Sequence, residues 1–161
     1  TAYRTAHGVD TAIVRIFNTY GPRMRADDGR AIPAFVGQAL SGRPLTVAGD
    51  GSQTRSICYV DDTVTGILAM AFSGHAGPVN IGNPDELSML RLAEWIVDLT
   101  GSDSAVDFID LPVDDPKVRR PDTTLAEQLL DWRPQVPSEE GLRRTVDWVA
   151  GQLATREVRA G

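Results

Sequence analysis

Residues 15–30 of the chain read RIFNTYGPRMRADDGR, and this stretch joins a hydrophobic strand to a polar loop. The β-branched run at 11–17 has the composition of a buried strand. In open α/β sheets, ligands bind where such strands end, at the carboxyl edge. The arginines of the loop, Arg23, Arg25 and Arg30, favour an anionic ligand, because guanidinium groups match the geometry of phosphate and carboxylate. A solvated turn with surface arginines is the alternative that this loop alone leaves open.

The bulk composition limits the class of protein. With 161 residues, 42% of them hydrophobic, the chain has the size and composition of one soluble globular domain or of part of one. Its net charge of −6 argues against a nucleic-acid partner, which requires clustered positive charge. No apolar run reaches the roughly 18 residues of a membrane span. One cysteine, Cys58, excludes an internal disulfide and favours a cytoplasmic location.

Hydrophobic periodicity predicts strands that alternate with helices, which is typical of the α/β class. The chain begins with Thr1 in a segment patterned like the end of a helix, so we expect a fragment of a longer protein. We expect Asp61 or Asp62 to cap a helix over 63–72, and Ser88 to cap the next one. The other expected elements are strands at 11–17, 44–47, 56–60, 78–81 and 106–111, helices at 1–7, 31–41, 89–101, 123–130 and 138–153, and a frayed tail at 151–161.

Several common catalytic patterns are missing. His7 and His75 have no further histidine or cysteine at metal-ligand spacing, so we expect no metal site. The segment AGDGSQTR at 48–55 carries two glycines of a G-x-G-x-x-G turn, but Thr54 replaces the third and a strand follows. It is therefore not a dinucleotide-binding fingerprint. Arg55 remains a candidate anion contact, with a surface arginine on an edge strand as the alternative.

Five blocks of sequence, in this order, resemble those of a known family: RIFNTYGPRM, PLTVAGDGSQTRSICYVDD, PVNIGNPDE, DDPKVRRPD and DWRPQVPSEEGLRRTVDW. Together they are similar to the carboxyl-terminal half of the extended short-chain dehydrogenase/reductases, the NAD-dependent epimerase/dehydratase family. The resemblance covers residues 3–149 and is strongest to members that decarboxylate UDP-glucuronate to UDP-xylose. The 4,6-dehydratases and 4-epimerases share several of the blocks, so a fragment of either is an alternative.

The resemblance implies an α/β fold: the carboxyl-terminal part of a Rossmann-type NAD(P)-binding fold with a small α+β substrate-binding lobe. Within one fragment, 1–161, we expect the Rossmann-like sheet over about 1–20 and 61–101. The nucleotide-sugar-binding lobe is then expected over about 21–60 and 102–150.

The resemblance also implies roles for individual residues. It places Val47 in the segment that lines the nucleobase pocket, Arg55 on the diphosphate and Arg119 near the glucuronate. Because a UDP-uronate carries two phosphates and a carboxylate, several arginines gathered locally suit it. The implied substrate-binding residues are Tyr3, Asn18, Val47, Arg55 and Arg119, and those implied near NAD are Thr19, Arg25 and Arg30.

In the family, NAD oxidises the sugar at C4, carbon dioxide leaves, and the hydride returns. The base is a tyrosine with a lysine four residues later. Here the residues four positions after the three tyrosines are His7, Met24 and Thr63, and Lys117 is the only lysine. We therefore expect no turnover by this chain alone, dependence on its own missing amino-terminal Rossmann half, and a homodimer at full length. A non-catalytic sugar-nucleotide-binding module is the remaining alternative.

Overall fold

The computed structural model describes residues 2–25, 29–112 and 118–160. Lys117 and part of the polar loop within 15–30 lie outside the described residues. The helices are α1 (Ala2–His7), α2 (Ala31–Leu40), α3 (Val60–Phe72), α4 (Met89–Thr100), α5 (Thr124–Leu130) and α6 (Ser138–Ala160). The strands are β1 (Val14–Ile16), β2 (Thr19–Tyr20), β3 (Leu45–Ala48), β4 (Thr54–Ser56), β5 (Cys58–Tyr59), β6 (Val79–Ile81), β7 (Glu86–Ser88), β8 (Val106–Ile109) and β9 (Val118–Arg119).

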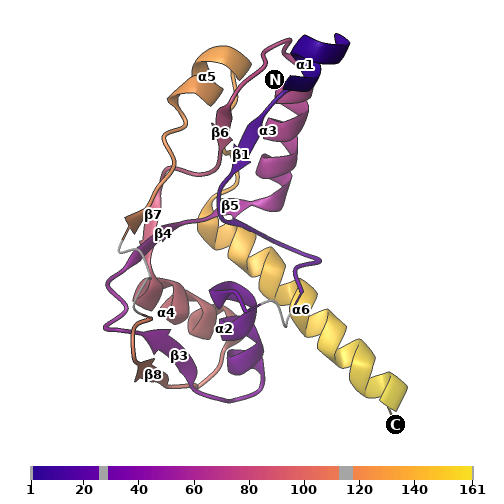
Figure 1. The fold of residues 1–161 in the computed structure, drawn as a ribbon. Coiled ribbons are helices and arrows are strands. Elements are labelled where there is room, and N and C mark those ends of the chain that lie inside the picture. Colours follow the sequence, from indigo (N-terminus) through magenta and orange to yellow (C-terminus); the bar gives the residue numbers. More distant parts are fainter. Residues whose placement is uncertain (1, 26–28, 113–117, 161) are drawn as a thin grey trace.

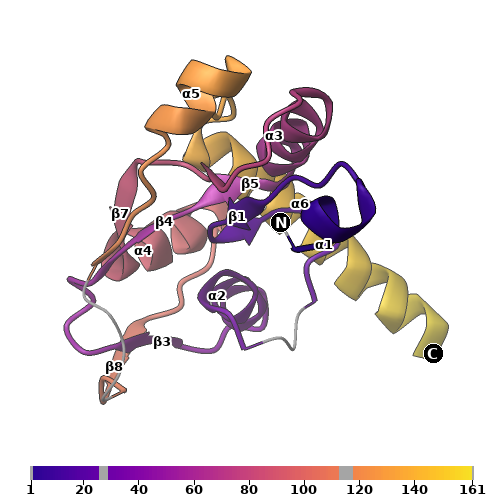
Figure 2. The same ribbon diagram turned by 45° about the horizontal axis from the view of Figure 1, so that its top comes forward.

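The strands form small, mostly parallel sheets, as the α/β class predicts. β1 pairs with β6, β2 with β5, and β3 with β8, each in parallel. A further sheet has the order β7–β4–β9, with β9 parallel and β7 antiparallel to β4. In Figure 1, β1, β6, α3 and α5 form one part of the molecule, and α2, α4, β3 and β8 form the other. Figure 2 shows β4 and β5 running between the two parts.

Two hydrophobic clusters correspond to these two parts. The smaller one joins α3, β6 and α5 through Met70, Ile81 and Ala126, with Trp132 beside them. The larger one joins α2, β3, α4 and α6, and its buried members include Phe35. Each cluster fills the space between a short parallel sheet and the helices that cover it, which is how α/β layers bury their apolar faces.

The clusters divide the chain differently from the ranges expected from the sequence. Helix α4, expected with the Rossmann-like sheet, packs through Leu92, Ala93 and Ile96 into the larger cluster. Helix α5, expected in the second lobe, packs into the smaller cluster. An amphipathic pattern shows which face of a helix is apolar, but not which of two sheets that face covers.

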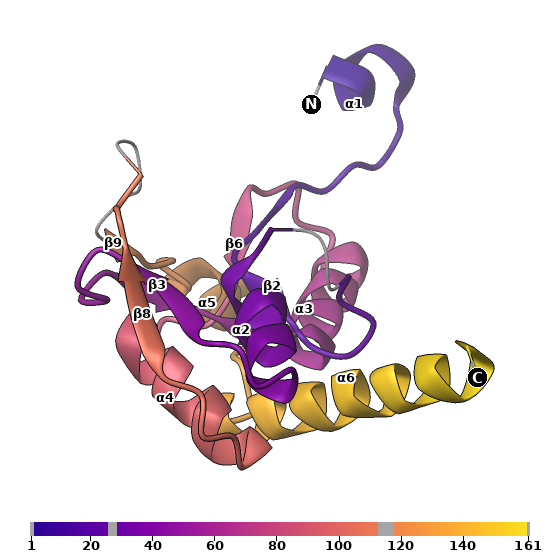
Figure 3. The ribbon, with the colours of Figure 1, turned by 90° about the horizontal axis from the view of Figure 1, so that it is seen from below.

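The helix boundaries agree with the sequence patterns at some positions and differ at others. The Ser88 hydroxyl accepts the Arg91 N–H at 3.1 Å, so the expected cap of α4 is confirmed. Helix α3 begins after Tyr59 without a side-chain cap, so the expected aspartate cap is wrong. Helix α6 continues to Ala160, past the expected end at Leu153. Figure 3 shows its last turns extending beyond the body of the molecule.

The Asp62 carboxylate has a different role from the expected cap. It is buried and accepts the backbone N–H groups of Gln135 and Val136 at 3.0 and 2.9 Å. The indole N–H of Trp132 donates to the Asp62 carbonyl at 3.1 Å. The start of α3 is therefore attached to the segment that precedes α6. A long-range pairing of this kind leaves no local signal in the sequence.

Candidate functional site

An open cavity of about 520 Å³ lies beside α2, on the side of the molecule that also contains β3 and α4. Residues from β2, β3, β4, β9, α2 and α4 line it, together with residues of the segments that connect the elements. Its polar lining residues are Asn18, Thr19, Tyr20, Arg30, Thr46, Gln53, Arg55 and Arg119. Its larger apolar lining residues are Met24, Ile32, Phe35, Ile57, Met89, Leu92 and Pro112. The cavity thus combines cationic groups with an apolar wall, as expected of a site for a small organic anion.

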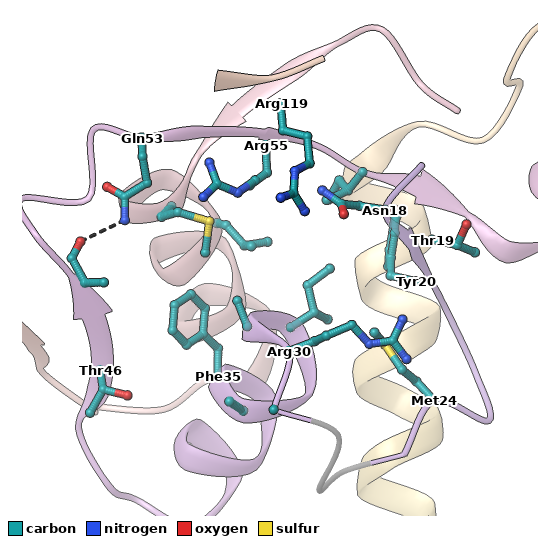
Figure 4. A pocket seen from close by; sticks show the side chains of 18 of the residues that line it. Asn18, Thr19, Tyr20, Met24, Arg30, Phe35, Thr46, Gln53, Arg55 and Arg119 are labelled. Carbon is teal, nitrogen blue, oxygen red and sulfur yellow. Dashed lines mark hydrogen bonds between the residues drawn. The ribbon is translucent and has the colours of Figure 1, made fainter. Parts of the chain in front are cut away.

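Arg55 and Arg119 define one wall of the cavity. They are register partners on the parallel strands β4 and β9, and both belong to the cavity lining. Figure 4 shows the guanidinium group of Arg119 beside the amide of Asn18 and that of Arg55 next along the same wall, toward Gln53. The Arg55 Nη1 donates to the Thr54 carbonyl at 2.7 Å, which restricts its orientation. Two guanidinium groups side by side can hold an anion with two charged groups, such as a diphosphate.

Arg30 approaches the same cavity from another direction. It is the N-cap residue of α2, with extended backbone angles, and Gly29, Ala31 and Ile32 beside it also line the cavity. In Figure 4 its guanidinium group lies on the side of Met24, across the cavity from Arg119. The partial positive charge at the start of a helix adds to that of the side chain. The positive charge of the site thus comes from three separate elements.

Thr19 lines the cavity, but its hydroxyl is engaged within the chain. Oγ1 donates to the Phe17 carbonyl at 2.9 Å and lies 3.0 Å from Oγ1 of Thr63. The carbonyl of Asn18 accepts the N–H of Cys58 at 2.8 Å. The backbone of residues 18–20 is therefore fastened to β5 and α3, and the Asn18 side chain is presented from a fixed position.

Three residues predicted for the site do not line the cavity. Tyr3 is 69% exposed on α1, which stands away from the body of the molecule in Figure 3. Arg25 is exposed and is not part of the lining. Val47 is fully buried in the larger cluster, while its neighbours Thr46 and Ala48 line the cavity. Alternation along β3 explains this, because successive side chains point to opposite faces of a strand.

The structure adds lining residues that the sequence patterns did not indicate. Gln53 is 8% exposed, and its Nε2 donates to the Ala48 carbonyl at 2.8 Å, as drawn in Figure 4. Phe35 and Ile32 line the cavity from α2. The apolar periodicity of α2 predicts a buried face, but it does not distinguish residues that contact only the core from those that also border a cavity.

The buried nucleophilic groups near the cavity are held in their neutral forms. Burial, with smaller contributions from neighbouring groups, raises the pKa of Tyr20 far above its ordinary value, and its hydroxyl donates to the Ser138 carbonyl at 2.9 Å. Burial also raises the pKa of Cys58 to about 11. Neither group is suited to act as a base or nucleophile at neutral pH. Within the described residues there is no cluster of three or more potential metal-ligating side chains.

Residues 1–82 match the NAD dependent epimerase/dehydratase family. The chain belongs to this family. Over 140 residues it is 46% identical to UDP-glucuronic acid decarboxylase 6 of Arabidopsis thaliana, covering 87% of this chain and 41% of that protein. Over 152 residues it is 45% identical to UDP-glucuronic acid decarboxylase 1 of Xenopus tropicalis, covering 94% of this chain and 36% of that protein. The chain thus spans less than half the length of these curated relatives.

Solved structures of the family share the fold. A UDP-glucuronic acid 4-epimerase from Bacillus cereus, in complex with UDP-glucuronic acid and NAD, is 30% identical with a TM-score of 0.84, over 94% of this chain and 48% of that one. A dTDP-glucose 4,6-dehydratase from Streptomyces venezuelae, solved with NAD bound, is 33% identical with a TM-score of 0.85. The match covers 95% of this chain and 48% of that one. The Rossmann-type α/β fold predicted from the sequence is therefore confirmed.

The family is NAD-dependent, and the residues of this chain fit only the edge of an NAD site. The sequence contains no G-x-G-x-x-G turn, whose backbone N–H groups receive the pyrophosphate of a dinucleotide. The Thr19 hydroxyl, predicted to lie near the cofactor, already has two partners inside the chain. Among the described helices, none is long and apolar enough to cross a membrane.

Proposed function

We propose that this chain is the nucleotide-sugar-binding part of an NAD-dependent UDP-glucuronate decarboxylase that makes UDP-xylose. The observation that carries the proposal is the register pairing of Arg55 with Arg119 on one wall of the cavity, with Asn18 beside them. The identity of about 45% to UDP-glucuronic acid decarboxylases over most of the chain supports it.

The cavity offers a separate place for each part of such a ligand. The diphosphate binds between Arg55 and Arg119, where two forked donors converge. The nucleobase lies against the apolar wall of α2, at Phe35 and Ile32, next to β3. The uronate carboxylate adds a further negative charge at the arginine-lined end, where Arg119 receives it. Binding is thus divided between charge recognition and apolar contact, as in most small-ligand sites.

The chemistry of the parent enzyme needs groups that this sequence lacks. The tyrosine–lysine pair and the glycine-rich turn are both missing, so we propose that the Rossmann half of the parent protein supplies them. Oxidation at C4, loss of carbon dioxide and return of the hydride then occur only in the assembled protein. The chain's own contribution is to bind the nucleotide sugar and orient it. A cytoplasmic location and homodimerisation of the full-length protein stay predictions.

The surface beside β1 suits the docking of that Rossmann half. Within the described residues, β1 pairs only with β6, so its other edge is open. Next to it, α3 exposes Val64, Leu68 and Phe72, at 47%, 50% and 86%. A spacing of four residues places these three side chains on one face of the helix. We propose that a further parallel strand pairs with β1 and that its connecting helix covers this face.

Two other functions remain as alternatives. The similarity to a UDP-glucuronic acid 4-epimerase and a dTDP-glucose 4,6-dehydratase favours a fragment of one of those enzymes. The chain as a non-catalytic sugar-nucleotide-binding module is the other. This last alternative predicts a cooperative thermal melt and UDP affinity in the isolated chain, with no activity after the Rossmann half is added.

Isothermal titration calorimetry on the isolated chain tests the proposal. UDP should bind more tightly than UMP, and both more tightly than uridine, because each phosphate adds contacts to the arginines. UDP-glucuronate should bind more tightly than UDP-glucose, since Arg119 then gains a carboxylate partner. Equal binding of these two sugars would favour the alternative enzymes, and equal binding of UDP and uridine would exclude a diphosphate site. With UDP-glucuronate and NAD added, the isolated chain should release no carbon dioxide.

A further inference from the structure

Tyr20 joins the wall of the cavity to a helix from the other end of the chain. Its ring lines the cavity, and its side chain is 2% exposed. Its hydroxyl donates to the carbonyl of Ser138, the first residue of α6, at 2.9 Å. The same residue belongs to β2, directly after Asn18 and Thr19, which also line the cavity. One side chain thus connects the binding wall with the start of α6.

The packing around this hydrogen bond is too tight for even one extra carbon atom. A Cβ added at Gly141, in the first turn of α6, would lie 2.3 Å from the Tyr20 hydroxyl oxygen and 2.8 Å from Cδ2 of Tyr59. The position of α6 relative to β2 and β5 is therefore closely defined. Glycine at this position lets the helix backbone approach the two tyrosine rings directly.

The segment before α6 is fixed independently, through the buried Asp62 carboxylate and its bonds to Gln135 and Val136. Trp132 adds a donor to the Asp62 carbonyl and to the Thr65 hydroxyl, both at 3.1 Å. Residues 132–138 are thus attached to α3 at one end and to Tyr20 at the other. They form a brace behind the part of the cavity wall that presents Asn18.

We propose that Tyr20 is a positioning residue for the nucleotide-sugar site: it holds residues 18–20 against the brace so that Asn18 stays at its place beside Arg119. The proposal rests on the proposed function, because it assigns Tyr20 a part in the same site. It goes beyond that function in making ligand affinity depend on α6, which lines no part of the cavity. Tyr20 acts through the backbone of β2, and its hydroxyl, already donated to Ser138, takes no part in the chemistry.

Tyr59 offers a matched control. It is the register partner of Tyr20 in the β2–β5 pair, and the two rings meet edge to face with centroids 5.8 Å apart. It is equally buried, at 4% exposed, and also contacts α6, where the Arg144 guanidinium lies 5.7 Å from its ring centre. However, Tyr59 does not line the cavity. Loss of its hydroxyl should therefore affect stability without affecting the binding wall.

The test compares Tyr20→Phe with Tyr59→Phe in the full chain, with UDP as the probe. Thermal melting measures stability, and calorimetry at a temperature well below the melting transition measures the affinity of folded protein. Tyr20→Phe should weaken UDP binding by about 3–10-fold, the range for loss of one neutral hydrogen bond. Both variants should lower the melting temperature to a similar extent. Tyr59→Phe should leave the UDP affinity within about twofold of that of the parent chain.

Gly141→Ala in both backgrounds checks the contact itself. The added methyl group should lower the melting temperature less in Tyr20→Phe than in the parent chain, because removal of the hydroxyl relieves the closest approach. Equal losses in the two backgrounds would show that the contact is not as described and overturn the inference. Equal UDP affinities of the parent chain and Tyr20→Phe would also overturn the inference, but they would leave the proposed function standing. If the parent chain bound no UDP, the proposed function would fail and this inference with it.

Discussion

Arg55 and Arg119 lie opposite each other on the neighbouring parallel strands β4 and β9, although 64 positions separate them in the sequence. Residues in register on adjacent strands present their side chains to the same face of the sheet. The pairing therefore places two guanidinium groups on one wall of the cavity. An acidic chain of net charge −6 obtains a local anion site in this way.

Removal of either guanidinium should weaken UDP binding. Arg55→Ala and Arg119→Ala should each raise the UDP dissociation constant about 10–100-fold, as expected for loss of a charge-assisted hydrogen bond. Arg119→Ala should also abolish any preference for UDP-glucuronate over UDP-glucose. Arg143→Ala, on an exposed turn of α6, is the control and should leave binding unchanged. Calorimetry at two salt concentrations measures these effects, and an unaffected dissociation constant in Arg55→Ala would contradict the assignment.

Gly66→Ala should destabilise the fold. A Cβ at this position would lie 2.7 Å from Cγ2 of Ile81 and 2.9 Å from Cε2 of Trp132, inside the smaller hydrophobic cluster. Overpacking of this kind costs about 1–3 kcal/mol of unfolding free energy. Gly151→Ala on α6, where nothing lies within 4 Å, should instead stabilise by about 0.5–1 kcal/mol. Urea denaturation of the two variants measures the change in unfolding free energy in each. If Gly151→Ala lost as much unfolding free energy as Gly66→Ala, the result would count against the packing described.

Asp62→Ala should destabilise the attachment between α3 and the segment before α6. It removes the acceptor of two backbone N–H groups, which costs about 1–3 kcal/mol if water does not replace it fully. Asp61→Ala, at the exposed neighbouring position in the same helical turn, should cost only about 0.5 kcal/mol through the helix dipole. Chemical denaturation of both variants at pH 7 checks the difference. Equal losses of unfolding free energy in the two variants would show that the hydrogen bonds of Asp62 contribute nothing beyond its interaction with the helix dipole.

The buried thiol of Cys58 predicts a loss of stability at alkaline pH. Its pKa is raised from 9.0 to about 11 in the folded chain, so the folded state retains the proton over a range in which the unfolded state releases it. The corresponding stabilisation is complete below pH 9 and declines as the pH rises through 11. Cys58→Ala removes this titration.

Between pH 8 and 10.5, the parent chain should therefore lose about 2 kcal/mol of unfolding free energy that Cys58→Ala does not lose. Urea denaturation of both proteins at the two pH values measures the difference. If the unfolding free energies of the two proteins changed in parallel with pH, the pKa of the thiol would not be raised in the folded chain. Tyr20, whose pKa is raised by burial and next by the neighbouring Cys58, adds a loss in the same direction at higher pH in both proteins.

Charged substitutions on α3 should prevent assembly with a Rossmann half. Leu68→Asp and Phe72→Asp place a carboxylate in the proposed docking face, where it would have to be desolvated. Phe108→Asp, on β8 in the other part of the molecule and 57% exposed, is the control. The measurement is decarboxylase activity after this chain is mixed with the amino-terminal half of the Arabidopsis relative. If the α3 variants and the control assembled equally well, the docking face would lie elsewhere.

The sequence by itself determined the fold class, the alternation of strands and helices, the cap of α4 at Ser88 and the family. These features depend on local patterns: hydrophobic period, a capping hydroxyl, and blocks of residues in a fixed order. Five of the eight predicted site residues line the cavity, namely Asn18, Thr19, Arg30, Arg55 and Arg119. Asn18, Thr19 and Arg30 belong to the polar stretch that follows β1, and Arg55 and Arg119 lie on the short strands β4 and β9.

Only the tertiary structure decided which of these residues meet, and why others do not. Thr46 and Val47 alternate along β3, but only the structure shows that the face of Val47 packs into the core and the face of Thr46 borders the cavity. The partners of Asp62 and Tyr20 lie more than 70 residues away, in a segment whose position depends on how α6 packs. Such contacts depend on the three-dimensional path of the whole chain, which no local pattern encodes.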